Sequence, residues 1–295
     1  MSISDGLKAH VESGVTTLAR CWALTRRDGT VMGFTDHDCE IAFGGITFRA
    51  DTRLTARALQ QTTGLAIDNS EALGALSDAS VTEADIRAGR YDGAEVEAWL
   101  VNWANPEDRL RQFRGALGEI TRAGGAFQAE LVGLSEALNL PQGRVYQTPC
   151  TAVLGDTSCK VNLADPALRG DGIVGAVEDQ KVFAITGLTS FGEAWFQRGL
   201  LTVLSGAAAG LTGVIRRDVL RDGARGIELW ESLRAEIAVG DSVRLIAGCD
   251  KRAQTCKDKF ANFINYRGFP DIPGEDRLLS IPTRSSGAAG SGGAK

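Results

Sequence analysis

Histidine is nearly missing from this chain, and several other features are scarce. The 295 residues include two histidines, His10 and His37, so a mechanism that needs several histidines is excluded. Proline occurs 7 times, which argues against a proline-rich linker protein. The longest uncharged stretch, 199–215, is shorter than the roughly 20 apolar residues of a membrane-spanning helix, and Gly206, Gly210 and Gly213 interrupt it. The first residues lack a basic segment followed by an apolar core, so no secretory signal is expected.

The charge balance also excludes some classes of partner. A net charge of −5 provides no overall attraction to nucleic acid or to an anionic membrane. Hydrophobic residues make up 43% and charged residues 23%, as in a folded protein, and the length suggests about two domains. We expect synthesis in a reducing bacterial cytoplasm, where disulfides are rare. The six cysteines therefore need another explanation.

Glycine is abundant, with 36 residues, and many glycines separate short apolar runs. This pattern predicts a mainly β protein with few short helices, among them 4–12, capped by Ser4, and a second capped by Thr82. We expect an antiparallel β domain over 1–145 and a second β-rich domain over 146–284, with strands at 181–186, 200–204, 213–216, 227–229 and 242–246. Residues 285–295, rich in Gly, Ala and Ser, predict a flexible tail.

Four of the six cysteines form two pairs in the second half. Cys150 and Cys159 enclose eight residues, Cys249 and Cys256 enclose six, and about ninety residues separate the pairs. Four thiolates are the ligand set of a structural zinc ion or of an iron–sulfur cluster. Structural zinc usually has two to four residues between ligands, so the longer spacing favours the larger iron–sulfur cluster. From spacing alone, ordinary buried cysteines remain the alternative.

The strings around these cysteines resemble a known family. TPCTAVLGDTSC (148–159) and CDKRAQTCKDKFANFINYRGFPDIPGED (249–276) resemble the C-terminal signature of phage tail hub proteins. In the first half, GFTDHDCEIAFGGITFRA (33–50) and SEALGALSDASVTEADIRAGRYDGAEVEAWLVNW (70–103) resemble the N-terminal domain of the same group. The sequence is most similar to the hub protein of gene transfer agents, which are phage-like particles. It is more distantly similar to the L-type minor tail protein of lambda-like siphophages.

The resemblance implies a structural protein rather than an enzyme, with no catalytic residues. It implies a homotrimeric baseplate hub that forms a ring between the distal tail protein and a large central tip or fibre protein. DNA would pass through the lumen on ejection without sequence-specific binding. The expected location is the virion tail tip, without stable membrane insertion, and a tail-associated peptidase is an expected neighbour.

The resemblance also implies that Cys150, Cys159, Cys249 and Cys256 hold a structural [4Fe–4S] cluster. Two other functions stay open from the residues: an iron–sulfur redox protein and a zinc-stabilised binding module. Metal identity separates the zinc module from the hub, and trimerisation with tail partners separates the hub from the redox protein.

The remaining candidates favour structural roles. The triplet 36–38, Asp-His-Asp, could bind a divalent ion, but alternation along a strand would put His37 on the opposite face from its neighbours, so turn and strand-edge hydrogen bonds are favoured. Cys21 and Cys39 are expected to be buried as small apolar side chains rather than paired. Phe260, Phe263 and Tyr266 recur at three-residue steps, which predicts a short helix packed beside the metal centre.

Overall fold

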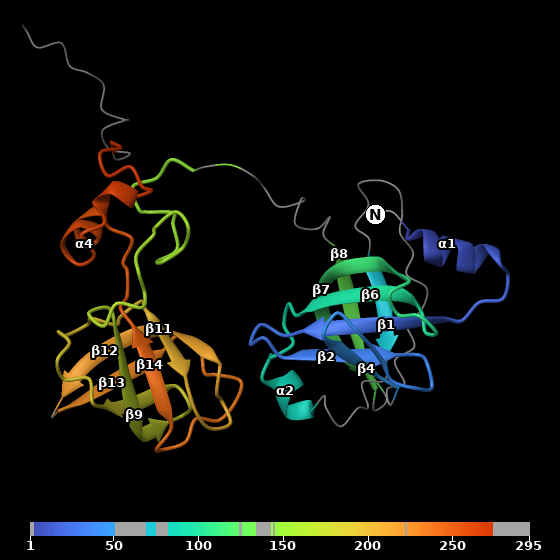
Figure 1. Ribbon diagram of the computed structural model, residues 1–295. Coiled ribbons are helices and arrows are strands. Elements are labelled where there is room, and N and C mark those ends of the chain that lie inside the picture. Colours follow the sequence, from blue (N-terminus) through green and yellow to red (C-terminus); the bar gives the residue numbers. More distant parts are fainter. Residues whose placement is uncertain are drawn as a thin grey trace, which may run out of the picture.

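The computed structural model describes residues 3–50, 69–74, 82–123, 126–133, 143, 145–221 and 223–273. Within these ranges the first half of the chain builds a β-sheet, and the second half builds a closed barrel with a small module around α4 (Figure 1). The prediction of a mainly β protein with few short helices is confirmed. The predicted tail, 285–295, lies outside the described residues.

The first half forms one eight-stranded sheet in the order β3-β4-β2-β1-β6-β7-β8-β5. Its strands are β1 Leu18–Thr25, β2 Val31–Thr35, β3 Ile41–Phe43, β4 Ile46–Arg49, β5 Asn69–Gly74, β6 Glu95–Asn102, β7 Arg109–Ala123 and β8 Ala126–Gly133. Every neighbouring pair is antiparallel except β2 and β4, which run parallel. The exception arises because the β3–β4 hairpin folds back so that β4, rather than β3, lies against β2.

Two short helices flank this sheet, and both begin where their capping residues predict. Ser4 precedes α1 (Asp5–Glu12), and its Oγ accepts the Leu7 N–H at 3.2 Å. Thr82 precedes α2 (Glu83–Arg87), and its Oγ1 accepts the Asp85 N–H at 3.1 Å. Each side chain satisfies an N–H that the first helical turn leaves without a partner. Among the described residues, no helix is both long enough and apolar enough to cross a membrane.

The second half forms a closed six-stranded barrel in the order β10-β13-β12-β11-β14-β9. Its strands are β9 Arg169–Glu178, β10 Val182–Thr186, β11 Leu200–Val203, β12 Thr212–Arg221, β13 Ala224–Leu229 and β14 Ser242–Ile246. Alternate residues point inward, as along β13, where Arg225, Ile227 and Leu229 are all buried. Most of the interior is apolar, including Phe183, Ile185, Leu201, Ile215 and Val243.

Strand β9 was not predicted from the sequence. Gly170, Gly172 and Gly175 interrupt its apolar pattern, so alternation gives a weak signal. The barrel explains one of these glycines directly. A Cβ on Gly172 would lie 2.5 Å from Ile185 Cγ2 on the neighbouring strand β10, so a larger residue would force the two strands apart.

The barrel closes through its first and last strands. β14 pairs antiparallel with β9, and Ile246 lies opposite Arg169. The start of β9 and the end of β14 are therefore neighbours at one end of the barrel. The chain that enters β9 and the chain that leaves β14 consequently emerge side by side (Figure 1).

One ion pair is fully buried in the barrel. Arg225 on β13 donates from Nη1 to both carboxylate oxygens of Asp218 on β12 at 2.7 Å, and neither side chain is exposed. Arg225 also donates to the carbonyls of Leu188, Phe191 and Gly192. Because the Asp218 carboxylate lies on β12 and the three carbonyls lie in the β10–β11 connection, one guanidinium fixes this connection against the barrel.

Replacing Arg225 with methionine should lower the free energy of unfolding by about 3–5 kcal/mol, because the buried Asp218 carboxylate would lose its partner. Urea denaturation followed by circular dichroism measures this change. Arg216 is the matched control, since its ion pair with Glu228 on the same sheet is half exposed. Arg216→Met should cost about 1 kcal/mol or less. Equal losses in the two variants would contradict the assigned role of Arg225.

Candidate metal centre

Barrel closure brings the two cysteine pairs together. We call residues 145–168, which lead into β9, and residues 247–273, which follow β14, the cysteine module. The Cys150 N–H donates to the Lys251 carbonyl at 2.9 Å, and Tyr266 Oη donates to the Thr148 carbonyl at 2.6 Å. Asn262 Nδ2 donates to the Cys159 carbonyl at 2.6 Å. These bonds hold two segments that are distant in sequence around a common centre.

The four predicted ligands line one narrow cavity of about 10 Å³. Apolar side chains cover part of its wall, and two basic residues also line it; the lining includes Leu154, Val161, Phe260, Tyr266, Lys251 and Arg252 as well as Cys150, Cys159, Cys249 and Cys256. None of the four cysteines forms a disulfide. So small a space suits a group that bonds directly to the sulfurs, because a metal–thiolate bond is much shorter than a non-bonded contact.

The first cysteine pair is shaped by a loop built on Asp156. Its carboxylate accepts the backbone N–H groups of Val153 at 2.9 Å, Ser158 at 2.9 Å and Cys159 at 2.6 Å. These N–H groups, together with the positive charge of Lys251, hold the pKa of Asp156 below its usual range. The loop therefore turns tightly enough to bring Cys159 back toward Cys150.

The second pair lies just beyond β14 and on a helix. Cys249 is three residues past the end of β14 at Ile246, and Cys256 lies on α4 (Ala253–Asp258). Lys251 adopts a φ of 66° between them, and Lys160 adopts a φ of 61° directly after Cys159. Non-glycine residues rarely adopt this left-handed conformation, which persists only where the surroundings hold it. The backbone is therefore strained beside a ligand in both segments.

Burial disfavours the charged form of two of these thiols. It raises the pKa of Cys256 to about 11, and the neighbouring Cys249, Cys150 and Cys159 add to the effect. Burial also raises the pKa of Cys249, although the backbone N–H of Lys251 partly offsets this. Because a metal binds the thiolate, loading of the site must release protons, and metal affinity should rise with pH.

Two N–H groups are directed at sulfurs of the predicted ligands, and neither was predicted from the sequence. The Arg267 N–H lies 3.4 Å from Cys150 Sγ, and Asn262 Nδ2 lies 3.7 Å from Cys159 Sγ. Hydrogen bonds of this kind stabilise thiolates and orient metal ligands. Neither residue belongs to a motif with regular spacing, so only the folded arrangement reveals them.

The predicted aromatic helix needs correction. The helix in this region is α4, which ends at Asp258, and a separate 3₁₀ turn, η1 (Phe263–Asn265), follows. Ala261 has a φ of 47°, so the chain reverses between the two elements. Phe260 and Tyr266 line the cavity as expected, whereas Phe263 is half exposed and stacks on Tyr266.

The triplet at 36–38 forms turn and strand-edge hydrogen bonds. Asp36 Oδ1 accepts the Arg20 N–H at 2.6 Å, and His37 Nδ1 accepts the Cys39 N–H at 3.0 Å. His37, Asp38 and Cys39 do bring three candidate ligand atoms within 4.8 Å, but Nδ1 already has a backbone donor and two of the residues are exposed.

The two remaining cysteines differ from each other. Cys21 is fully buried on β1, as predicted, and burial raises the pKa of its thiol to about 11. Cys39 was expected to be buried, but it is exposed, because it follows the turn after β2 rather than lying within a strand. Neither forms a disulfide.

Comparisons with known proteins agree with this architecture. Residues 4–162 match the model of a family described as baseplate hub protein, N-terminal attachment domain. This match covers more than half of the chain. The chain belongs to the baseplate hub protein family. Residues 194–276, which include the second cysteine pair, match a second family, described as phage conserved hypothetical protein BR0599.

A solved structure extends the comparison to almost the full length. The chain is similar to one in a structure described as the virion of a native gene transfer agent particle, with 53% sequence identity and a TM-score of 0.87. The match covers 96% of this chain and 97% of that chain. No curated protein matches the chain. The similarity to this virion chain therefore extends over both the sheet and the barrel with its module.

Asp156→Ala should lower the metal affinity about 10-fold or more, because the N–H groups around Cys159 would lose their acceptor. Metal retained per chain, measured during titration with a chelator, reports this change. The carboxylate acts above the usual aspartate pKa, and its contribution is lost as the pH falls through its lowered value in the folded protein. The difference between wild type and variant should therefore shrink at acidic pH.

The matched control is Asp165→Ala. The Asp165 carboxylate accepts one N–H, from Ala167, at 2.9 Å, and lies beyond the second cysteine of the pair. We expect metal retention in this variant to equal that of the wild type. The same loss in both variants would show that Asp156 has no particular role at the site.

Proposed function

We propose that this chain is the baseplate hub of a gene transfer agent tail and that it carries a structural [4Fe–4S] cluster. The observation that carries the hub assignment is the match to a chain of a gene transfer agent virion at 53% identity over 96% of the length. Its place would be the virion tail tip. There a homotrimeric ring would connect the distal tail protein to the central tip protein, with a tail-associated peptidase as a neighbour.

Two features support a cluster on Cys150, Cys159, Cys249 and Cys256. The four thiols line one cavity, and N–H groups approach the sulfurs of Cys150 and Cys159. When bound, the cluster would supply iron–thiolate bonds that link the two segments. Arg267 and Asn262 would then hold N–H groups against thiolate sulfur.

The make-up of the module supports a structural role for the cluster. The cysteine module has almost no apolar core: its buried residues apart from Gly248 are Ala152, Cys159, Leu168, Ala247 and Cys256. Two of these, Cys159 and Cys256, are among the four proposed ligands. A small unit without a core needs a disulfide or a metal to stay folded, and metal-binding free energy then becomes folding free energy. A redox role has no comparable support.

The proposed passage of DNA fits the charge of the chain. A net charge of −5 gives no general attraction to phosphates, so DNA could slide past without being held. Sequence-specific binding would need a basic surface to position the duplex. The proposed function is therefore that of a connector and a conduit for DNA.

Protein purified without oxygen should contain four irons and four acid-labile sulfides per chain and should be brown. Cys249→Ser should lower both iron and sulfide strongly, because it removes one of the four thiolates. Elemental analysis and a sulfide assay measure the outcome. Cys39→Ser is the matched control, since Cys39 is exposed and distant from the module in sequence, and it should leave both values unchanged.

The other outcomes discriminate between the alternatives. Zinc without sulfide would support the zinc-stabilised binding module. A protein without any metal would contradict the metal centre and return the four cysteines to the role of small buried side chains. The hub assignment would survive that result, because it rests on the family match.

The hub should assemble as a homotrimer. Light scattering should give a mass three times the chain mass of 31.2 kDa for the chain alone, or this mass plus that of the bound partner after mixing with the distal tail protein. Mixing with an unrelated β protein is the control and should leave the mass unchanged. The mass of a single chain under both conditions would contradict the trimer.

A further inference from the structure

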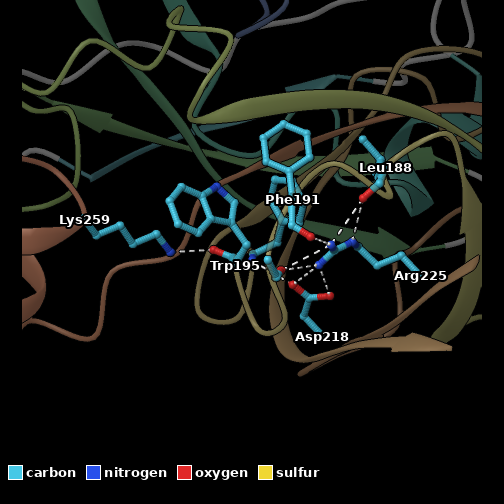
Figure 2. Close-up of polar contacts among 8 residues, drawn as sticks. Leu188, Phe191, Trp195, Asp218, Arg225 and Lys259 are labelled. Carbon is cyan, nitrogen blue, oxygen red and sulfur yellow. Dashed lines mark hydrogen bonds and ion pairs between the residues drawn. The ribbon is translucent and has the colours of Figure 1, made fainter. Parts of the chain in front are cut away.

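The segment 188–199, which connects β10 to β11, lies between the barrel and the cysteine module and is held from both sides (Figure 2). On the barrel side, Arg225 donates to the carbonyls of Leu188 at 3.2 Å and Phe191 at 2.6 Å. Asp218, the partner of Arg225, accepts the Phe196 N–H at 2.8 Å. The fully buried ion pair is thus also the inner anchor of this segment.

On the module side, the anchor is Lys259. Its Nζ donates to the Trp195 carbonyl at 2.6 Å (Figure 2). It also donates to the Gly248 carbonyl at 2.9 Å. The same ammonium lies 4.4 Å from the centre of the Trp195 ring, within the range of a cation–π interaction. Gly248 directly precedes the ligand Cys249, and Lys259 follows the ligand Cys256 by three residues. One side chain therefore joins the stretches that carry Cys249 and Cys256 to the segment.

The backbone of the segment depends on these anchors. Ala194 and Arg198 adopt φ values of 54° and 66°, which are unfavourable for residues with a Cβ. Gly248 packs so closely that a Cβ there would lie 1.7 Å from the Gln197 carbonyl oxygen. Strained conformations of this kind persist only where neighbouring contacts hold them. The segment has few buried side chains of its own, chiefly Leu188 and Phe196.

Lys259 is partly buried where it makes these contacts. Burial lowers the pKa of its ammonium, whereas the negative charges of Cys249, Asp218 and Asp250 raise it.

We propose that Lys259 couples occupancy of the cysteine site to the conformation of segment 188–199. Lys259 is a positioning residue in this scheme. When the site is filled, α4 and Cys249 are fixed, so Lys259 holds the Trp195 carbonyl and keeps the strained segment in place. When the site is empty, that anchor weakens, and the exposed edge of the segment (Glu193, Ala194, Gln197 and Arg198) loses its fixed shape. The proposal rests on the proposed function, because it takes the cluster as the occupant.

Hydrogen exchange on the full-length chain tests this coupling. The wild type is compared with and without its cluster, the cluster being removed by oxidation and a chelator, and iron and sulfide are measured on the same samples. The reporter amides are Trp195, Gln197 and Gly248, which donate to the carbonyls of Gly192, Ala194 and Trp195. We expect the exchange rates of these amides to rise about tenfold or more when the cluster is removed. A hydrogen bond from a charged donor shifts a local opening equilibrium by about that factor.

The variants separate coupling from simple destabilisation. Lys259→Met should show fast exchange in segment 188–199 both with and without the cluster, since the connection itself is gone. Lys259→Arg keeps a charged donor and should restore protection and its dependence on the cluster. Lys257→Met is the matched control, because Lys257 is an exposed residue of the same helix, and it should behave like the wild type.

The outcomes distinguish this proposal from the proposed cluster. A wild type that binds neither iron nor sulfide would overturn the cluster. In a protein that binds both, unchanged exchange of segment 188–199 on cluster removal would overturn the coupling alone. So would a Lys259→Met variant whose segment still responds to removal of the cluster.

Discussion

The closure of the barrel by β9 and β14 is the constraint on which the rest of the structure depends. These strands are the first and the last of the barrel, and their antiparallel pairing places Arg169 opposite Ile246. The two cysteine pairs lie just outside these strands, on the chain that enters β9 and the chain that leaves β14. A flexible chain would lose considerable entropy in bringing such distant segments together. Here the folded barrel already holds the two segments next to each other, so the pairing of β9 with β14 sets the geometry of the cysteine site.

The buried ion pair of Asp218 and Arg225 connects the barrel interior to the end of the barrel that carries the cysteine module. An isolated charge in an apolar core would be unfavourable, but each partner here satisfies the other, and the remaining N–H groups reach backbone carbonyls. The pair therefore specifies one arrangement of the β10–β11 connection. From there Trp195 and Lys259 reach the cysteine module, so the barrel interior and the ligands belong to one continuous set of polar contacts.

The module also shows why a metal is a reasonable solution at this end of the chain. Its turns and short helical elements bury few apolar side chains, and its backbone is strained at Lys160, Lys251 and Ala261. Neither hydrophobic burial nor regular hydrogen bonding is sufficient to hold such a unit. A bound cluster would replace the missing core. A connector that keeps its shape between neighbouring proteins would benefit from that rigidity.

The sequence by itself determined the mainly β class and the starts of α1 and α2, and it singled out the four cysteines that line one cavity. Turn glycines, capping residues and thiols are all local signals. The sequence did not determine strand β9, whose glycines hide the alternation, or the parallel pairing of β2 with β4. Only the tertiary structure showed that the barrel is closed, that Cys39 is exposed, and that Asp156, Asn262 and Lys259 support the site. These features depend on which segments meet across long separations, and that is decided by strand pairing and packing rather than by any residue's neighbours in the chain.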